Sequence, residues 1–210
     1  DERICEDRPD LRNASRSKAL WIRKFVTEEV RARPDFAGFV LTGWRDTPIS
    51  SSGVFDDWGE ARFSPEETGA WNGPTALFLI PQRRPPWVHG GNRPGWVDRF
   101  NHPPGAILLR VGVHSEGEAV GALEWRIVGL DGREVISGVA PQTRVPALVP
   151  TEVGEVYWHA EAPGEFWLEA RFGSAANRWP LWILSDAPAG NAEWGKHDPL
   201  ELLPDLELSG

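Results

Sequence analysis

Apolar residues in the first part of the chain recur every three or four positions, a spacing typical of a helix with one buried face. Between residues 15 and 33 these positions are Trp21, Ile22, Phe25, Val26 and Val30. Ser15 or Ser17 can cap the start of this predicted helix with a side-chain oxygen. Pro34 ends it, because proline restricts the residue before it and has no backbone N–H to donate.

The next apolar segment shows no such spacing. It reads AGFVLTGWRDTP over residues 37–48, with the apolar run at residues 38–41. A short continuous apolar run is typical of a strand buried on both faces, as in a parallel sheet covered by helices. Trp44, Arg45 and Asp46 then follow at the C-terminal end of this predicted strand.

A second helix is predicted to begin near Ser64. Pro65 suits the first helical position, and Glu66 and Glu67 suit the positive end of the helix dipole. The helix could extend toward residues 77–80, although the Gly-Pro pair at 73–74 interrupts it. The order of helix, buried strand, loop and helix predicts an α/β fragment over residues 1–85. One strand cannot form a parallel sheet alone.

Further along the chain, over residues 106–185, apolar and polar residues alternate with a period of two. Residues 86–105 are dense in proline and glycine and predict a linker. Over residues 106–185, alternating runs are separated by turn signals, and Asp131-Gly132 is a strong hairpin signal. We expect an antiparallel β-sandwich of immunoglobulin-like size there. Residues 186–210 are assigned to a tail or to the start of a further domain.

Composition narrows the class of protein. The chain has 22 basic and 31 acidic residues and a formal net charge of −9, which argues against nucleic acid or an anionic membrane as a partner. No apolar run approaches the roughly 18 residues of a membrane span. Cys5 is the single cysteine, and the five histidines have no metal-ligand spacing, so we expect no disulfide, metal or cofactor. The chain contains no methionine, and we expect it to be a fragment.

Three segments together resemble the glycoside hydrolase family 2-type proteins, the β-galactosidase and β-glucuronidase relatives. They are RPDFAGFVLTGWRDTP, SGVFDDWGEARFSPEE and NRWPLWIL, of which the last spans residues 177–184. The resemblance covers roughly residues 20–184. It implies the last helix-strand-helix unit of a (β/α)8 catalytic barrel, followed by an accessory β-sandwich.

The resemblance also implies a substrate-binding role for three residues. Residues 38–41 would be the eighth barrel strand, and active sites of such barrels lie at the C-terminal ends of the strands. Trp44, Arg45 and Asp46 would then face a sugar pocket, with the Trp44 indole stacking on a pyranose ring. The alternative is that Trp44 plugs the barrel mouth and Asp46 pairs with Arg45.

The resemblance places the two catalytic glutamates upstream of this chain, so we expect no catalytic residue here and no activity of the chain alone. The paired carboxylates of the chain have simpler explanations. Glu28 and Glu29 are expected on a solvated helix face, Asp56-Asp57 in a turn, and Glu66-Glu67 at a helix N-terminus.

The twelve tryptophans allow a second function. Exposed tryptophans bind glycans, so the chain could be a non-catalytic carbohydrate-binding or interdomain structural module. We expect most sandwich tryptophans, including Trp125, Trp158 and Trp167, to lie in the core or between domains. Trp179 and Trp182 are three residues apart and must face opposite sides of a strand.

Overall fold

The computed structural model describes residues 9–47, 53–82 and 97–185. Its helices and strands, in chain order, are α2 (Pro9–Arg31), α3 (Pro65–Asn72), β1 (Thr75–Leu79), β2 (Asn101–His102), β3 (Gly105–Ser115), β4 (Ala119–Gly121), β5 (Leu123–Gly129), β6 (Glu134–Val139), β7 (Thr143–Val145), β8 (Thr151–Ala160), β9 (Gly164–Phe172) and β10 (Ala175–Ile183). The prediction that residues 106–185 form strands throughout is confirmed. No helix in these ranges has the length and apolarity to span a membrane.

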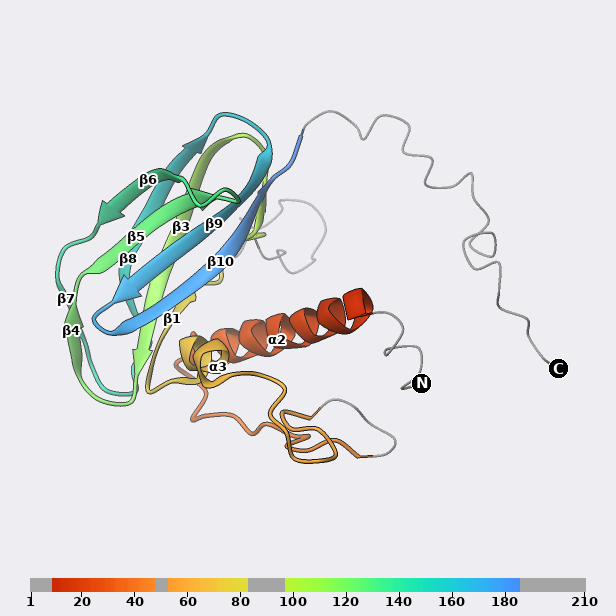
Figure 1. Ribbon diagram of the computed structural model, residues 1–210. Coiled ribbons are helices and arrows are strands. Elements are labelled where there is room, and N and C mark those ends of the chain that lie inside the picture. Colours follow the sequence, from red (N-terminus) through yellow and green to blue (C-terminus); the bar gives the residue numbers. More distant parts are fainter. Residues whose placement is uncertain (1–8, 48–52, 83–96, 186–210) are drawn as a thin grey trace, which may run out of the picture.

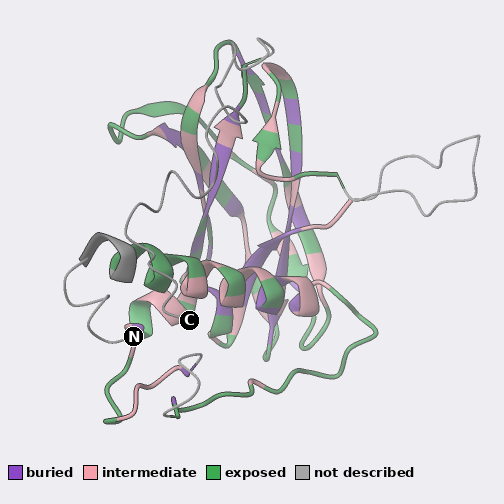
Figure 2. Cartoon of the chain, turned by 90° about the vertical axis from the view of Figure 1, so that its right-hand side faces the viewer, coloured by how far each residue is buried: buried purple, intermediate pink, exposed green. Residues whose placement is uncertain are grey.

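The strands form a β-sandwich (Figure 1). One sheet has the order β1-β3-β8, the facing sheet has the order β2-β10-β9-β5-β6, and β4 and β7 form a small ribbon. All pairs are antiparallel except β10 with β2. Alternate residues of both sheets point inward, and buried residues gather between the sheets (Figure 2).

The hairpin predicted at Asp131-Gly132 is confirmed. β5 and β6 pair antiparallel, and Gly132 has a φ of 77°, a conformation that glycine adopts without strain. The N–H of Gly132 donates to the Gly129 carbonyl at 3.0 Å, and the Gly129 N–H donates to the Arg133 carbonyl at 2.9 Å. The turn therefore fixes the register of the two strands.

The helix expected to extend toward residues 77–80 ends at Asn72, and the following apolar run is a strand. β1 pairs antiparallel with β3, with Phe78 opposite Gly112. Four of its five residues are buried, so periodicity could not distinguish this strand from a buried helix. The sandwich thus begins before the predicted linker, and β2 within that linker also belongs to it. Residues 83–96, with Trp87 and Trp96, lie outside the described residues.

Residues 38–41 do not form the predicted buried strand. They are irregular, and Val40 is 88% exposed. A strand buried on both faces needs neighbouring strands and covering helices. Within the described residues no strand pairs with this segment. A barrel fragment is therefore not observed in residues 9–47 and 53–82, the described portion of this part of the chain, and that part of the fold remains a proposal.

α2 packs on the sandwich through part of its predicted apolar face together with buried polar residues. Trp21 and Phe25 contact Phe100, with ring centroids 5.1 and 6.1 Å apart. Ile22 and Val26 are half-exposed, whereas Thr27, Glu28 and Arg31 are buried. Figure 2 shows the helix lying across one end of the two sheets. The helix therefore docks on groups that need polar partners, which apolar periodicity does not reveal.

Glu28 makes the central contact of this interface. Its carboxylate accepts hydrogen bonds from the Asn177 amide and from the Trp179 indole N–H, both at 2.8 Å, and it forms an ion pair with Lys24. Burial lowers the pKa of Lys24, while the Glu28 carboxylate opposes this shift. The expectation that Glu28 lies on a solvated face is wrong, because buried donors on β10 require an acceptor.

Candidate functional site

Trp44, Arg45 and Asp46 lie in a loop that pairs with residues 53–62. Arg45 and Phe55 form an isolated parallel bridge. The Asp46 N–H donates to the Phe55 carbonyl at 2.9 Å, and the Phe55 N–H donates to the Trp44 carbonyl at 3.0 Å. These hydrogen bonds hold the two segments together, and the three predicted site residues occupy one compact region.

Asp46 is buried, and both oxygens of its carboxylate have partners. One of its carboxylate oxygens accepts from the Gly53 N–H at 2.5 Å, and the other pairs with Arg62. A side chain at position 53 would collide with the backbone, because a Cβ there would lie 2.5 Å from the Asp46 nitrogen. The alternative that Asp46 pairs with Arg45 is wrong, because its partner is Arg62. Asp46 organises the loop.

Arg45 also stabilises the loop. Its guanidinium donates to the Asp56 carbonyl at 3.3 Å and to the Asp57 carbonyl. The Asp56 carboxylate in turn accepts from the N–H groups of Trp58 and Glu60 at 3.0 and 2.8 Å. The turn role predicted for this aspartate pair is confirmed for Asp56.

Trp44 presents an exposed aromatic side chain that can meet a ligand. It is 65% exposed, and one edge packs against Phe55 with ring centroids 5.1 Å apart at 50°. Trp58 on the paired segment is 76% exposed. An indole held by its neighbours offers a flat apolar surface and an N–H, which suit the C–H face and hydroxyls of a sugar.

The other carboxylate pairs are structural. Ser64 and Glu67 form a capping box at the start of α3, as predicted for this helix terminus. The hydrogen bond from Arg16 and the backbone N–H of Ser64 lower the pKa of Glu67. Glu29 pairs with Arg99. Within the described ranges no group of three or more His, Cys, Asp or Glu side chains could hold a metal ion.

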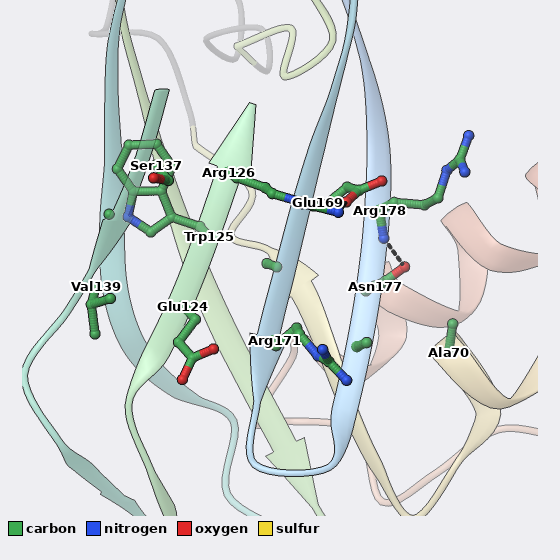
Figure 3. Close-up of a pocket in the computed structure, with 13 residues that line it drawn as sticks. Ala70, Glu124, Trp125, Arg126, Ser137, Val139, Glu169, Arg171, Asn177 and Arg178 are labelled. Carbon is green, nitrogen blue, oxygen red and sulfur yellow. Dashed lines mark hydrogen bonds and ion pairs between the residues drawn. The ribbon is translucent and has the colours of Figure 1, made fainter. Parts of the chain in front are cut away.

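A second concave region lies on the outer face of the larger sheet. This groove has a volume of about 680 Å³ and crosses β6, β5, β9 and β10, with Ala70 of α3 at its margin (Figure 3). Its charged side chains are Glu124, Arg126, Glu169, Arg171 and Arg178. Arg126 and Glu169 form an ion pair of 2.8 Å across β5 and β9.

The expectation that Trp167 lies in the core or between domains did not reveal the groove, whose lining does not include Trp167. Leu168, Ala170 and Phe172 of β9 are buried, so Trp167 and its alternate neighbours face outward. The alternation of inward and outward positions along β9 was the feature of the sequence that indicated this orientation. Trp158 is buried as predicted. The prediction that Trp179 and Trp182 face opposite sides is confirmed, since Trp179 lies in the core and Trp182 borders an outer cleft.

These features define the structure as a β-sandwich with a docked N-terminal helix and an aromatic loop. The described fold is similar to part of a β-D-mannosidase from Dictyoglomus thermophilum, with a TM-score of 0.50 and 14% identity over 78% of this chain and 18% of that one. A β-glucuronidase from glycoside hydrolase family 2 matches 51% of this chain and 11% of its own, with a TM-score of 0.33 and 10% identity.

A cycloisomaltooligosaccharide glucanotransferase from Paenibacillus sp. matches 41% of this chain and 13% of its own, with a TM-score of 0.34 and 12% identity. The chain thus spans less than a fifth of these three proteins. No protein-family description and no curated protein sequence matches the chain. The likeness to the β-mannosidase shows a shared fold.

Proposed function

We propose that this chain is the C-terminal part of a glycoside hydrolase, formed by the end of a (β/α)8 catalytic barrel and an accessory β-sandwich. The parent protein would cleave glycosidic bonds in carbohydrates. Its two catalytic glutamates would lie upstream of this chain, and the chain alone would be inactive. The paired carboxylates of the chain support this division, because Glu28, Glu29, Asp56 and Glu67 each have a structural partner.

The observation that carries the proposal is the extent of the match to the β-mannosidase. It covers 78% of the chain, whereas the strands of the sandwich lie within residues 75–183, just over half of it. The match therefore takes in part of the region before β1 as well as the sandwich. A match confined to the sandwich would be weaker support, because sandwiches occur in many unrelated proteins and fold alone does not define function.

Trp44 is the substrate-binding residue of this proposal. Its indole is exposed, while Arg45 and Asp46 hold the loop that presents it. In the complete parent the loop would lie at the mouth of the barrel, where sugars bind. Arg45 and Asp46 then act as positioning residues for the Trp44 platform.

Kinetics of the complete parent test the proposal. The parent should hydrolyse chromogenic aryl β-glycosides, and the purified 210-residue chain should not. Trp44→Ala in the parent should lower kcat/KM about 5- to 150-fold, equivalent to about 1–3 kcal/mol of lost transition-state stabilisation.

Trp58→Ala is the matched control, because it removes another exposed indole from the paired segment. Its kcat/KM should stay close to that of the parent. Turnover by the isolated chain would contradict the upstream position of the catalytic glutamates. An unchanged kcat/KM in a folded Trp44→Ala variant would assign Trp44 to packing.

A further inference from the structure

We propose that the free edge of β6 pairs antiparallel with the same edge of a second copy of this chain and joins their larger sheets into one. Among the described residues β6 is the last strand of its sheet and pairs only with β5 (Figure 1). An open strand edge presents backbone N–H and C=O groups to which another strand can be added. The proposal does not rest on hydrolase activity, because it concerns backbone pairing alone.

The free backbone groups of this edge belong to Ser137 and Val139. The Ala140 N–H donates to the Leu123 carbonyl at 2.8 Å, which places the backbone groups of Ala140 on the β5 side. Because these groups point alternately to the two sides of a strand, Gly138 also faces β5, whereas Ser137 and Val139 face away. Within the described ranges no hydrogen bond reaches the backbone N–H or C=O of Ser137 or Val139.

The free edge is short, and neither of its ends can continue a ladder. At one end the register of β5 and β6 shifts beside Val135, a bulge that interrupts the regular alternation. At the other end Pro141 has no backbone N–H. A partner strand therefore gains hydrogen bonds only from Ser137 and Val139, and a longer strand would gain no more than a short one.

β6 itself is a strand that matches this short edge. In antiparallel pairing around Gly138, Ser137 of each copy lies opposite Val139 of the other copy. Each of these two symmetric pairs exchanges N–H···O=C bonds in both directions, so every free donor and acceptor of Ser137 and Val139 finds a partner. The same surface patch serves both copies, as in the two-fold contacts of most homodimers.

The side chains near the two-fold axis leave room for this contact. Gly138 of one copy would face Gly138 of the other, with no side chain between them. The Trp125 indole covers each glycine, since a Cβ at position 138 would lie 2.6 Å from that ring. Trp125 is only partly buried, and the two indoles would lie near each other across the axis. Val139, which is 71% exposed, would be covered by the partner strand.

The charges of β6 also permit self-pairing. Glu134 is the single charged residue of the strand, and in the register around Gly138 its two copies would lie roughly 27 Å apart along the strands. β6 contains no lysine and no proline, the residues that often protect an exposed edge from pairing. The net charge of −9 opposes association at long range, so added salt should strengthen the contact.

Sedimentation equilibrium of the 210-residue chain tests the proposal, at about 0.15 M salt and from about 10 μM to about 1 mM protein. The average mass should rise toward that of a dimer, with a dissociation constant of about 100 μM, as for other small interfaces. Amide exchange measured by NMR locates the contact. Exchange at Ser137 and Val139 should slow as the dimer fraction grows, because their N–H groups become hydrogen-bonded.

Two variants disrupt the edge without touching the β5–β6 ladder. Val139→Pro removes an N–H that faces away from β5, a position at which edge strands tolerate proline, and the preceding glycine avoids the usual clash. Ser137→Lys places a positive charge at the edge. Each should weaken association at least about tenfold. The control Leu108→Ser removes an exposed apolar side chain from β3 and should associate like the unaltered chain.

Three results would overturn the proposal. The first is a monomer at every concentration. The second is unchanged association of both β6 variants, with circular dichroism showing that they fold, which would place the contact on another surface. The third is association that leaves the exchange of the Ser137 and Val139 amides unaltered. This last measurement uses the unaltered chain, so it decides the matter even where a variant does not fold.

Discussion

At the scale of single residues, buried polar groups determine how the helical segment joins the sandwich. Asn177 donates to both Glu28 and the Leu77 carbonyl, at 2.8 Å each, and so links α2, β1 and β10. Trp179 is fully buried and donates its indole N–H to the same carboxylate. A buried acceptor that serves several donors is costly to remove, because each donor then loses its partner.

Glu28→Ala should therefore destabilise the chain strongly. The variant leaves Lys24, Asn177 and Trp179 without their shared acceptor. We expect the free energy of unfolding to fall by about 3–5 kcal/mol, measured by urea denaturation. The control Glu118→Ala breaks an exposed ion pair with Arg144 and should cost less than about 1 kcal/mol. A similar small loss for Glu28→Ala would contradict the buried contact.

His114 should make stability depend on pH. Burial, followed by the positive charge of Arg31, lowers the pKa of His114, and Glu116 partly opposes this. The unfolded state then binds the proton more tightly, so acidification favours unfolding. The penalty should appear as the pH falls below about 6.5, the ordinary histidine value, and should be complete below the folded pKa.

His114→Gln should reduce this loss of stability. The check is the free energy of unfolding of both proteins at about pH 7.5 and about pH 5, across the ordinary histidine pKa. His159→Gln removes an exposed imidazole and is the control. An identical loss of stability in the chain and in His114→Gln would show that other groups cause the pH dependence.

At the scale of elements, the sequence predicted helix caps and turns correctly, but it did not predict which distant strands pair. Ser64 and Pro65 mark the start of α3, and Asp131-Gly132 marks the β5–β6 turn, because caps and turns depend on adjacent residues. The run of β1 is buried whether it is a helix or a strand, and its partner β3 comes after the predicted linker. The groove likewise depends on which residues of each strand face outward and on the pairing of β5 with β9, which are distant in sequence.

Gly112→Ala tests the pairing of β1 with β3. A Cβ at this position would lie 2.4 Å from the ring of Phe78, which is itself buried and has little room to move. We expect a loss of about 1–3 kcal/mol in the free energy of unfolding, as for other overpacked sites. Gly117→Ala, where nothing lies within 4 Å of the added atom, should have a much smaller effect. Equal effects would indicate that Phe78 does not pack on Gly112.

At the scale of the whole molecule, the sandwich and the segment between α2 and α3 differ in how far their apolar side chains are buried. The sandwich has a continuous core between its two sheets. The segment between α2 and α3 leaves large apolar side chains exposed, among them Phe36, Phe39 and Val40. Exposed apolar surface of this kind marks an interaction site. It supports the proposal that the rest of a barrel covers this segment in the parent.

Hydrogen exchange of residues 39–41 tests this central claim most directly. In the described structure their backbone N–H groups donate no hydrogen bond, so the isolated chain should exchange them rapidly. In the complete parent the same amides should be protected by pairing as the eighth barrel strand. The β3 amides should be protected in both proteins and provide the internal control. Protection of residues 39–41 that appears only in the parent is the predicted result. Equally rapid exchange in both would contradict the barrel proposal.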